Sequence, residues 1–400
     1  MIILGLNSGT SRDGVAAAIF RSPKLSPGMK IEILGSSQFP YPAGILNELT
    51  GLENQPDLER LSRLNFLLGE FFAQCAIQAL KKSGVRAGRV ALIGSHGQTV
   101  GHFPARKKMS GYGIRATLQL GEPSVIAART GITTVGDFRP ADIAAGGEGA
   151  PVLTVAEYLL FHSAVKNRMA LNLGGIANFS LIPKRGKPGD VRASDCGPCN
   201  ILLDGLARAL SKGRMQFDRG GQMAMSGRAR REWVRLFLKH PFFKRRAPKS
   251  SGREDFSRDW LNGILRGLRV KSRADRADLI RSGARAVAQM VSRCYFDNYA
   301  GFPLEEVIVS GGGVENRALV LELSGSLGIR MIPSDELGVP AQAKEPVGFG
   351  LLAELCVYGK EGNLPGATGA GRGAILGKIA PGRNWRKVVQ NLKAVKGVGR

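Results

Sequence analysis

The sequence is short of aromatic residues, cysteine, histidine and acidic residues, and these shortages exclude several classes of protein. Aromatic residues make up 6% of the 400 residues, and neither zinc-finger spacing nor an aromatic RNA-binding motif is present. Five cysteines in a chain of this length do not make a disulfide framework. No apolar run reaches the roughly 18 residues that a membrane-spanning helix needs. We therefore expect neither a membrane protein nor a disulfide-rich secreted domain.

The chain starts with a short apolar run. Met1–Leu6 has no basic residue ahead of it and is followed at once by polar Asn7 and Ser8. A signal peptide places a basic region before a longer apolar stretch, so this pattern predicts an opening strand instead. Hydrophobic residues make up 43% and charged residues 22% of the chain, which is typical of a folded protein of two or three domains. We expect a cytoplasmic protein.

Basic residues are in large excess and are concentrated in two segments. The chain has 57 Lys and Arg against 32 Asp and Glu, a net charge of +25. Residues 371–400 carry eight basic and no acidic residues, and residues 227–254 carry ten basic and two acidic ones. Clustered Lys and Arg can bind nucleic-acid phosphates, but no nucleic-acid-binding motif accompanies them. Two alternatives are a basic surface in a host with a basic proteome and a surface that attracts anionic substrates, and we expect no nucleic-acid partner.

Glycine accounts for 54 residues and gathers in clusters between regular segments. Short apolar runs predict strands at Ile2–Leu6, Val15–Phe20, Ile31–Leu34, Val90–Ile93, Ile132–Val135, Met169–Leu173, Phe179–Ile182 and Val307–Val309. Longer patterns predict helices at Asp57–Lys82, Pro151–His162, Asn200–Ser211, Ala274–Asn298, Asn316–Leu327 and Val347–Tyr358. This alternation predicts an α/β fold. A strand–turn–strand pattern at Ile3–Phe20 and again at Ala170–Pro183 suggests an internal duplication.

Three glycine-rich segments are suited to binding phosphate. Gly9–Gly14 offers amides and hydroxyls between two strands, and its Asp13 is a hard oxygen ligand of the kind that Mg²⁺ prefers. Asn172–Asn178 contains a Gly-Gly turn, and Gly311–Gly313 lies between a buried strand and a helix that Asn316 opens. No Walker sequence is present. Taken singly, each segment is also compatible with an ordinary turn or with close packing of a helix on a strand.

The segment Asp195–Asn200 has the sequence Asp-Cys-Gly-Pro-Cys-Asn. Cys-Gly-Pro-Cys is a redox motif of thioredoxin-like domains, but no such domain pattern surrounds it. The acidic Asp195 directly before Cys196 also disfavours a thiolate at that cysteine. The other interpretation makes Asp195 the functional residue, placed before a turn and a helix that begins near Asn200.

Two further segments have the composition of ligand-binding loops. His96–Thr99 follows a predicted strand, and His102 lies six residues beyond His96, but no third ligand accompanies this pair to make a metal site. Asp137–Asp142 contains two acids and Arg139, and the glycine-rich stretch Gly146–Pro151 that follows it adds Glu148 as a third acid. An exposed turn with an Asp137–Arg139 pair is the alternative interpretation of this segment.

These segments together resemble the anhydro-N-acetylmuramic acid kinases over nearly the whole chain. The matching motifs, in order, are Ser8–Gly14, His96–Val100, Gln119–Gly121, Ala128–Gly131, Asp137–Arg139, Gly146–Pro151, Asn172–Asn178, Gly197-Pro198, Pro248–Glu254, Gly311–Gly313, Asn316 and Gly362–Pro365. Each motif is weak alone, but their joint order and spacing are specific. The resemblance implies an ATP-dependent enzyme that opens the 1,6-anhydro bridge of an amino sugar and phosphorylates the freed 6-oxygen. The product, N-acetylmuramic acid 6-phosphate, serves peptidoglycan recycling.

The resemblance also implies a fold and a set of site residues. The fold is the two-lobed actin-like ATPase fold of sugar kinases, with residues 1–130 and about 345–400 in one α/β lobe, 131–344 in the other, and the active site in the cleft between them. Asp195 is the catalytic base, and Asp13 binds Mg²⁺. The ATP-binding residues are Gly9, Thr10, Ser11, Arg12, Asp13, Gly14, Val15, Ala16, Asn172, Gly174, Gly175, Gly311, Gly312, Gly313 and Asn316. The substrate-binding residues are His96, Gln98, Arg129, Asp137, Arg139, Gly197, Asn200 and Glu345. A homodimer is also expected.

The sequence departs from the family pattern at four positions. Asn7 stands where relatives commonly have Met, and Ala16 replaces a common acid. Cys196 and Cys199 replace Thr and Gly beside the expected base, so a disulfide between them is a hypothesis for redox control. Two other functions remain open at this stage: a kinase of another amino sugar, and a nucleotide-binding regulatory or nucleic-acid-associated protein.

Overall fold

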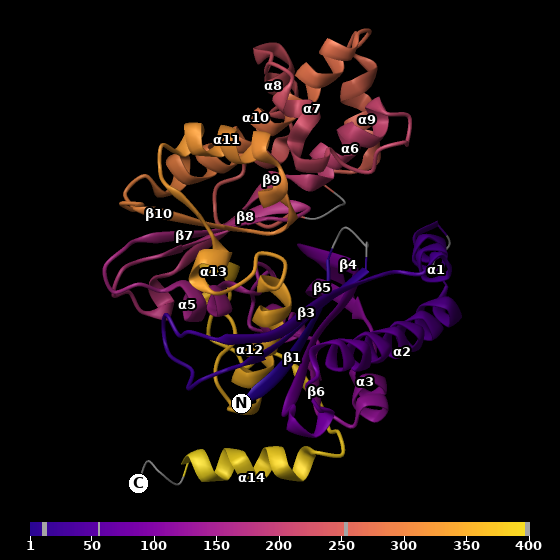
Figure 1. Cartoon of the computed structure of the whole chain (residues 1–400), viewed down its shortest axis with the longest axis vertical. Helices are drawn as coiled ribbons and strands as arrows, with labels where there is room; N and C mark the ends of the chain where they lie inside the picture. Colours follow the sequence, from indigo (N-terminus) through magenta and orange to yellow (C-terminus); the bar gives the residue numbers. More distant parts are fainter. Residues whose placement is uncertain (10–13, 55–56, 252–254, 397–400) are drawn as a thin grey trace. The chain divides into compact units, whose positions relative to one another are not determined.

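The computed structural model describes residues 1–9, 14–54, 57–251 and 255–396. The chain forms two compact α/β units (Figure 1). Unit 1 comprises Met1–Leu160 and Ala343–Arg400, and unit 2 comprises Phe161–Gln342. None of the helices in the described ranges is long and apolar enough to cross a membrane.

Unit 1 is built on a seven-stranded mixed sheet. Its strands are β1 (Ile2–Ser8), β2 (Gly14–Arg21), β3 (Glu32–Pro40), β4 (Leu92–Met109), β5 (Tyr112–Leu120), β6 (Thr134–Gly136) and β12 (Lys378–Ala380). The order is β12-β6-β4-β1-β2-β3, and β5 pairs with β4. The hairpin strands β1, β2 and β3 are antiparallel, whereas β4 runs parallel to β1 and β6 parallel to β4.

Helices cover both faces of this sheet. They are α1 (Ala43–Asn54), α2 (Leu58–Ser83), α3 (Pro123–Thr130), α4 (Pro140–Ala144), α5 (Thr154–Phe161), α12 (Lys344–Val357), α13 (Pro365–Thr368) and α14 (Trp385–Lys396), with a 3-10 turn, η1 (Ala87–Arg89). Leu4 and Leu6 of β1 belong to the apolar core that includes Phe72 of α2. Gly5 between them faces α12, where a Cβ atom would collide with the carbonyl of Pro346. Glycine in β1 thus lets a helix backbone lie directly on the sheet.

Unit 2 is built on a five-stranded sheet in the order β11-β10-β7-β8-β9. Its strands are β7 (Arg168–Leu173), β8 (Ile176–Ile182), β9 (Arg192–Pro198), β10 (Glu306–Ser310) and β11 (Met331–Pro333). Its helices are α6 (Asn200–Leu210), α7 (Gln222–Met225), α8 (Arg231–Phe237), α9 (Arg258–Arg266), α10 (Arg273–Tyr299) and α11 (Arg317–Leu327). Five short 3-10 helices complete it: η2 (Pro188–Asp190), η3 (Arg219–Gly221), η4 (Pro241–Lys244), η5 (Gly312–Glu315) and η6 (Ser334–Leu337).

The two units repeat one sheet topology. In unit 1 the five strands β3-β2-β1-β4-β6 are neighbours in that order, and in unit 2 the strands β9-β8-β7-β10-β11 are arranged in the same way. In both units the first three strands form an antiparallel meander and the last two run parallel to the first. The internal duplication predicted from the two hairpin patterns is therefore confirmed at the level of topology.

The strands and helices predicted from the sequence are all present, but the boundaries between the units differ from those expected. Residues 131–160 were expected in the second lobe, and the structure places them in unit 1. The reason is β6, which pairs with β4 and so completes the first sheet. The chain returns to unit 1 at Ala343, close to the expected position of about 345.

Candidate active site

In unit 1, a buried polar cluster holds the two ends of the first predicted phosphate loop. Ser8 Oγ lies 2.7 Å from Gln98 Oε1, 2.8 Å from Tyr41 Oη and 2.9 Å from the carbonyl of Gly14. Gln98 Nε2 donates to the carbonyl of Gly9 at 3.3 Å. The loop residues between, Thr10, Ser11, Arg12 and Asp13, lie outside the described residues. Gln98 is fully buried, so its amide positions the ends of the loop instead of lying open to a ligand.

The strand after this loop contains Gly14, Val15 and Ala16. Gly14 has φ +152°, and a Cβ atom there would collide with the carbonyl of Phe39, so only glycine fits. Ala16 lies opposite Asn7 in the β1–β2 ladder. Asn7 Nδ2 donates to Glu345 Oε2 at 2.8 Å. Asn7 and Ala16, two of the positions that depart from the family pattern, are therefore neighbours. Asn7 also orients Glu345, which the resemblance implies is a substrate-binding residue.

His96 is held between three groups of unit 1. Arg139 Nε donates to His96 Nε2 at 3.1 Å, and His96 Nδ1 lies 3.4 Å from the carbonyl of Ser8. The ring stacks on Phe349, with centroids 4.4 Å apart. Burial, together with the smaller effect of the positive charge of Arg139, lowers the pKa of His96 from 6.5 to about 3. The imidazole is therefore neutral, with Nδ1 as its donor.

This lowered pKa predicts a pH-dependent stability. Below about pH 6.5 the unfolded His96 binds a proton, whereas the folded one does not. The contribution of His96 to the free energy of unfolding is therefore complete above pH 6.5 and is lost as the pH falls toward 3. Between pH 7 and pH 5 we expect this group alone to cost about 2 kcal/mol of unfolding free energy. The check is urea unfolding of wild type and His96→Gln at both pH values. An equal decrease in the two proteins would contradict the prediction.

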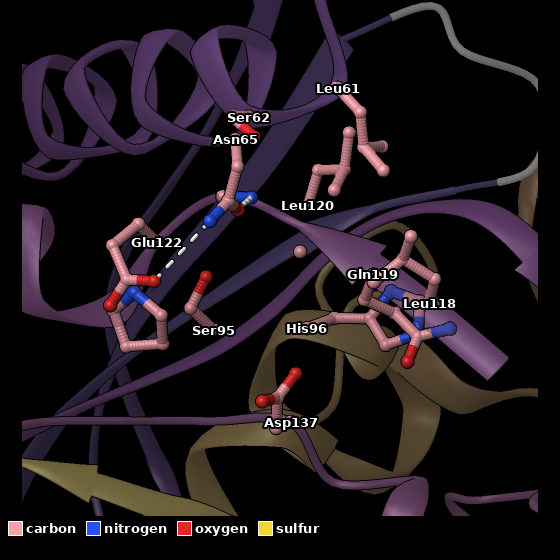
Figure 2. A pocket seen from close by; sticks show the side chains of 13 residues that line it. Leu61, Ser62, Asn65, Ser95, His96, Leu118, Gln119, Leu120, Glu122 and Asp137 are labelled. Atoms are coloured by element: carbon pink, nitrogen blue, oxygen red, sulfur yellow. Dashed lines mark hydrogen bonds between the residues drawn. The ribbon is translucent and has the colours of Figure 1, made fainter. Parts of the chain in front are cut away.

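A pocket of about 260 Å³ opens beside His96 (Figure 2). Asp137, which follows β6, also lines it. Asp137 adopts the left-handed φ of +55°, rare for a residue other than glycine, and one of its oxygens accepts from Lys378 Nζ at 2.8 Å. The alternative of an Asp137–Arg139 pair is therefore wrong, since Arg139 donates to His96 and to the carbonyl of Gly149.

Arg129 does not line this pocket. Its guanidinium forms three hydrogen bonds to Glu70, with Nη2 2.6 Å from Oε1, and 61% of its side chain is exposed. Arg129 was expected among the substrate-binding residues, and in this structure its guanidinium binds the carboxylate of Glu70 in α2.

A buried carboxylate joins two of the family motifs in unit 1. Asp142 accepts from the amide of Gly149 at 2.8 Å, from Asn363 Nδ2 at 2.6 Å and from Thr368 Oγ1 at 2.6 Å. A Cβ atom on Gly147 would collide with this carboxylate. The segments Gly146–Pro151 and Gly362–Pro365 are thus parts of one hydrogen-bonded structure.

In unit 2, the other predicted phosphate-binding residues lie together at the ends of β7 and β10. Gly311 has φ +84°, and a Cβ atom there would lie 2.8 Å from Asn172 Oδ1. Asn200, at the start of α6, donates from Nδ2 to the carbonyl of Leu173 at 3.1 Å and from its amide to the carbonyl of Gly174. The structure therefore brings Asn172, Gly174 and Gly175 beside Gly311, Gly312 and Gly313. Asn316 caps α11 through the amide of Leu319.

Asp195 lies on β9 of unit 2 and is 6% exposed. Its Oδ2 accepts from the amide of Ser251 at 2.8 Å, and its own amide donates to the carbonyl of Lys249. The segment Pro248–Glu254 is one of the motifs that match the family, and the sequence alone assigns it no role. The structure shows that its described residues hold the expected base, while 252–254 lie outside the described residues. Gly197 lies two residues further along, where a Cβ atom would collide with Phe243.

The cysteines beside Asp195 are free thiols. Cys196 hydrogen-bonds to Cys294 of α10, whereas Cys199 Sγ lies 3.7 Å from Asn200 Oδ1. All five cysteines of the chain are buried and unpaired, so the hypothetical disulfide between Cys196 and Cys199 is not formed in this structure. Burial raises the pKa of Cys196 and of Cys199 well above the ordinary thiol value, which disfavours a reactive thiolate at either residue.

Within the described ranges, no group of three or more His, Cys, Asp or Glu side chains is arranged to hold a metal ion. Asp13, the expected Mg²⁺ ligand, lies outside the described residues, so we assign no catalytic step to a metal.

The repeated sheets and the paired glycine segments belong to a two-unit α/β protein, and the family model that the sequence matches makes its class that of a kinase. The family model of "Anhydro-N-acetylmuramic acid kinase" matches residues 1–382, and the chain belongs to this family.

Relatives named anhydro-N-acetylmuramic acid kinase align over almost the full length. The protein from Gloeobacter violaceus is 39% identical, covering 95% of this chain and 98% of its own. Those from Caldanaerobacter subterraneus and Bacillus cereus are 37% and 33% identical, each covering 95% of this chain and 96% and 99% of their own.

Among solved structures, component A of (R)-2-hydroxyglutaryl-CoA dehydratase from Acidaminococcus fermentans is similar with 15% identity and a TM-score of 0.43, covering 88% of this chain and 97% of its own. A ROK family glucokinase from Streptomyces griseus gives 15% identity and a TM-score of 0.38, covering 88% and 99%.

Proposed function

We propose that this chain is an ATP-dependent hydrolytic kinase that converts 1,6-anhydro-N-acetylmuramic acid to N-acetylmuramic acid 6-phosphate for peptidoglycan recycling. Family membership over residues 1–382 is the observation that carries the proposal. A kinase of this fold uses ATP and acts on a small amino sugar. The related proposals are that Mg²⁺ accompanies the nucleotide, that the enzyme is a cytoplasmic homodimer, and that it binds no nucleic acid.

The proposed mechanism begins with Asp195. A carboxylate base removes a proton from the water that attacks the anomeric carbon, which breaks the bond from that carbon to the bridging oxygen. The amide of Ser251 donates to Oδ2 and so orients the carboxylate that acts as the proton acceptor. The bridging oxygen, freed as the 6-oxygen, then attacks the γ-phosphorus of ATP, and ADP leaves.

The glycine segments of unit 2 supply the phosphate-binding surface in this proposal. Amides at the turn Gly174-Gly175 and in Gly311–Gly313 offset negative charge on the transferring phosphoryl group. In unit 1, the Ser8–Gln98 cluster positions the ends of the first phosphate loop. We retain His96, Asp137, Arg139 and Glu345 as proposed substrate residues, and the location of the active site in a cleft between the lobes also stays a proposal.

The direct test is ADP release measured with a coupled assay in Mg-ATP. We expect turnover with 1,6-anhydro-N-acetylmuramic acid and none with N-acetylglucosamine or unbridged N-acetylmuramic acid, since only the bridged sugar supplies the bond that water opens. Turnover with another amino sugar instead would favour a kinase of different specificity. Absence of turnover with all three sugars, in protein that binds ATP, would overturn the proposal.

A further inference from the structure

The pocket in unit 1 lies where small molecules bind in many α/β sheets. Ser95 and His96 directly follow Ile93 and Gly94, the residues of β4 that pair with β6, and Asp137 follows β6, which runs parallel to β4. Ligands of such sheets bind outside the carboxyl ends of the parallel strands. The remaining walls come from the first turns of α2, from β5 and from the start of α3: Leu61, Ser62, Asn65, Leu118, Gln119, Leu120, Glu122 and Pro123.

Two buried polar atoms of this pocket have no hydrogen-bond partner. They are Ser95 Oγ and Gln119 Oε1, in residues that are 2% and 8% exposed. Gln119 Nε2 donates to the hydroxyls of Thr117 and Thr99 at 2.8 and 3.2 Å, which leaves Oε1 as an acceptor. An unmade hydrogen bond at a buried atom costs roughly 1–3 kcal/mol. A ligand that supplies both bonds would recover that cost.

The charges of the pocket select against an anionic group. Glu122 and Asp137 line one side, and the set of lining residues contains neither Lys nor Arg. Asn65 Nδ2 and the amide of Ser124 donate to the Glu122 carboxylate, and Lys378 donates to one oxygen of Asp137. Two carboxyl groups in the wall disfavour a further acidic group in the pocket, so a phosphate or a lactyl carboxylate would be repelled.

The pocket suits a neutral amide that carries a methyl group. An amide directs its N–H and its C=O in opposite directions, and the pocket offers a free acceptor at Gln119 and a hydroxyl donor at Ser95. Figure 2 shows these two residues on different sides of the pocket. The side chains of Leu61, Leu120 and Pro123 add apolar wall for the methyl group.

We propose that this pocket binds the 2-acetamido group of the sugar substrate, and that Ser95 and Gln119 determine specificity for acetamido sugars. Ser95 Oγ donates to the acetamido carbonyl, and Gln119 Oε1 accepts from the acetamido N–H. The inference rests on the proposed function, but it assigns a role to two residues that sequence reasoning did not select. Gln119 belongs to the matching motif Gln119–Gly121, and Ser95 directly precedes the matching motif His96–Val100.

The test is calorimetric titration of the full chain, without nucleotide, with 1,6-anhydro-N-acetylmuramic acid and with its analogue that has a hydroxyl in place of the acetamido group. We expect wild type to prefer the acetamido sugar by about tenfold or more. Ser95→Ala and Gln119→Met should each lower affinity for that sugar by about tenfold and leave affinity for the analogue unchanged. Gln74→Met, on the exposed face of α2, is the matched control.

A second measurement separates binding from folding. Because Ser95→Ala removes an unpartnered buried hydroxyl, the unliganded variant should melt at or above the wild-type melting temperature. The increase in melting temperature that the acetamido sugar causes should be smaller in the variant than in wild type. Equal loss of affinity for both sugars, or unchanged preference in both variants, would overturn the acetamido assignment. If wild type still phosphorylates the anhydro sugar in that case, the proposed function stands. If wild type neither binds nor phosphorylates it, both proposals fail.

Discussion

The Asp195→Asn enzyme should bind ATP and the sugar normally and turn over about 10²–10⁴-fold more slowly than wild type, the range typical of a lost general base. Asparagine keeps an oxygen that accepts from the amide of Ser251, so the local structure is retained. What is lost is the basicity needed to deprotonate water. The measurement is kcat for the anhydro sugar in Mg-ATP, together with nucleotide affinity by titration.

Asp259→Asn provides the control for this variant. Asp259 is an exposed carboxylate in the first turn of α9, also in unit 2, and its replacement should leave kcat unchanged. Near wild-type turnover by Asp195→Asn would remove Asp195 from the mechanism. A large drop in nucleotide affinity alone would instead indicate that Asp195 shapes the ATP site.

Lys344→Met should destabilise unit 1 by about 3–5 kcal/mol, the usual cost of removing one partner of a buried ion pair. Lys344 Nζ lies 2.6 Å from Glu157 Oε1, and the two side chains are 3% and 5% exposed. Without the ammonium group, the Glu157 carboxylate stays buried but loses its cationic partner. The measurement is the midpoint of urea unfolding, followed by circular dichroism.

Two further variants distinguish loss of the ion pair from loss of packing. Lys344→Met combined with Glu157→Leu should recover most of the stability, because an apolar pair of similar volume removes the buried charge. Arg63→Met breaks an exposed pair with Glu59, whose side chains are 79% and 74% exposed, and should change stability little. If the double variant is no more stable than the single one, packing rather than charge explains the loss.

Local signals in the sequence were sufficient to predict much of the fold. The alternation of apolar runs with glycine turns placed β1, β2, β7 and β10 correctly, and Asn316 was recognised as the start of a helix that it caps. These features depend on residues close together along the chain, where periodicity and capping chemistry act directly.

The partners of charged and polar side chains could not be predicted in this way. Arg129 pairs with Glu70, which is 59 residues away, and Gln98 bonds to Ser8, 90 residues away. An arginine suited to a substrate carboxylate is equally suited to a glutamate of a neighbouring helix. Only the folded geometry decides between them. Ser95 is an ordinary serine in the sequence, and its significance comes from burial without a partner.

The order of the two units along the chain has a consequence for synthesis on the ribosome. Unit 2 is one uninterrupted segment, Phe161–Gln342, and all five strands of its sheet are complete once that segment has emerged. Unit 1 has by then contributed most of its strands, but it still lacks α12 and β12. Since domains fold as units while the chain grows, unit 2 can reach its native state before unit 1, whose synthesis starts earlier and ends later. Until α12 emerges, the face of β1 that carries Gly5 stays uncovered.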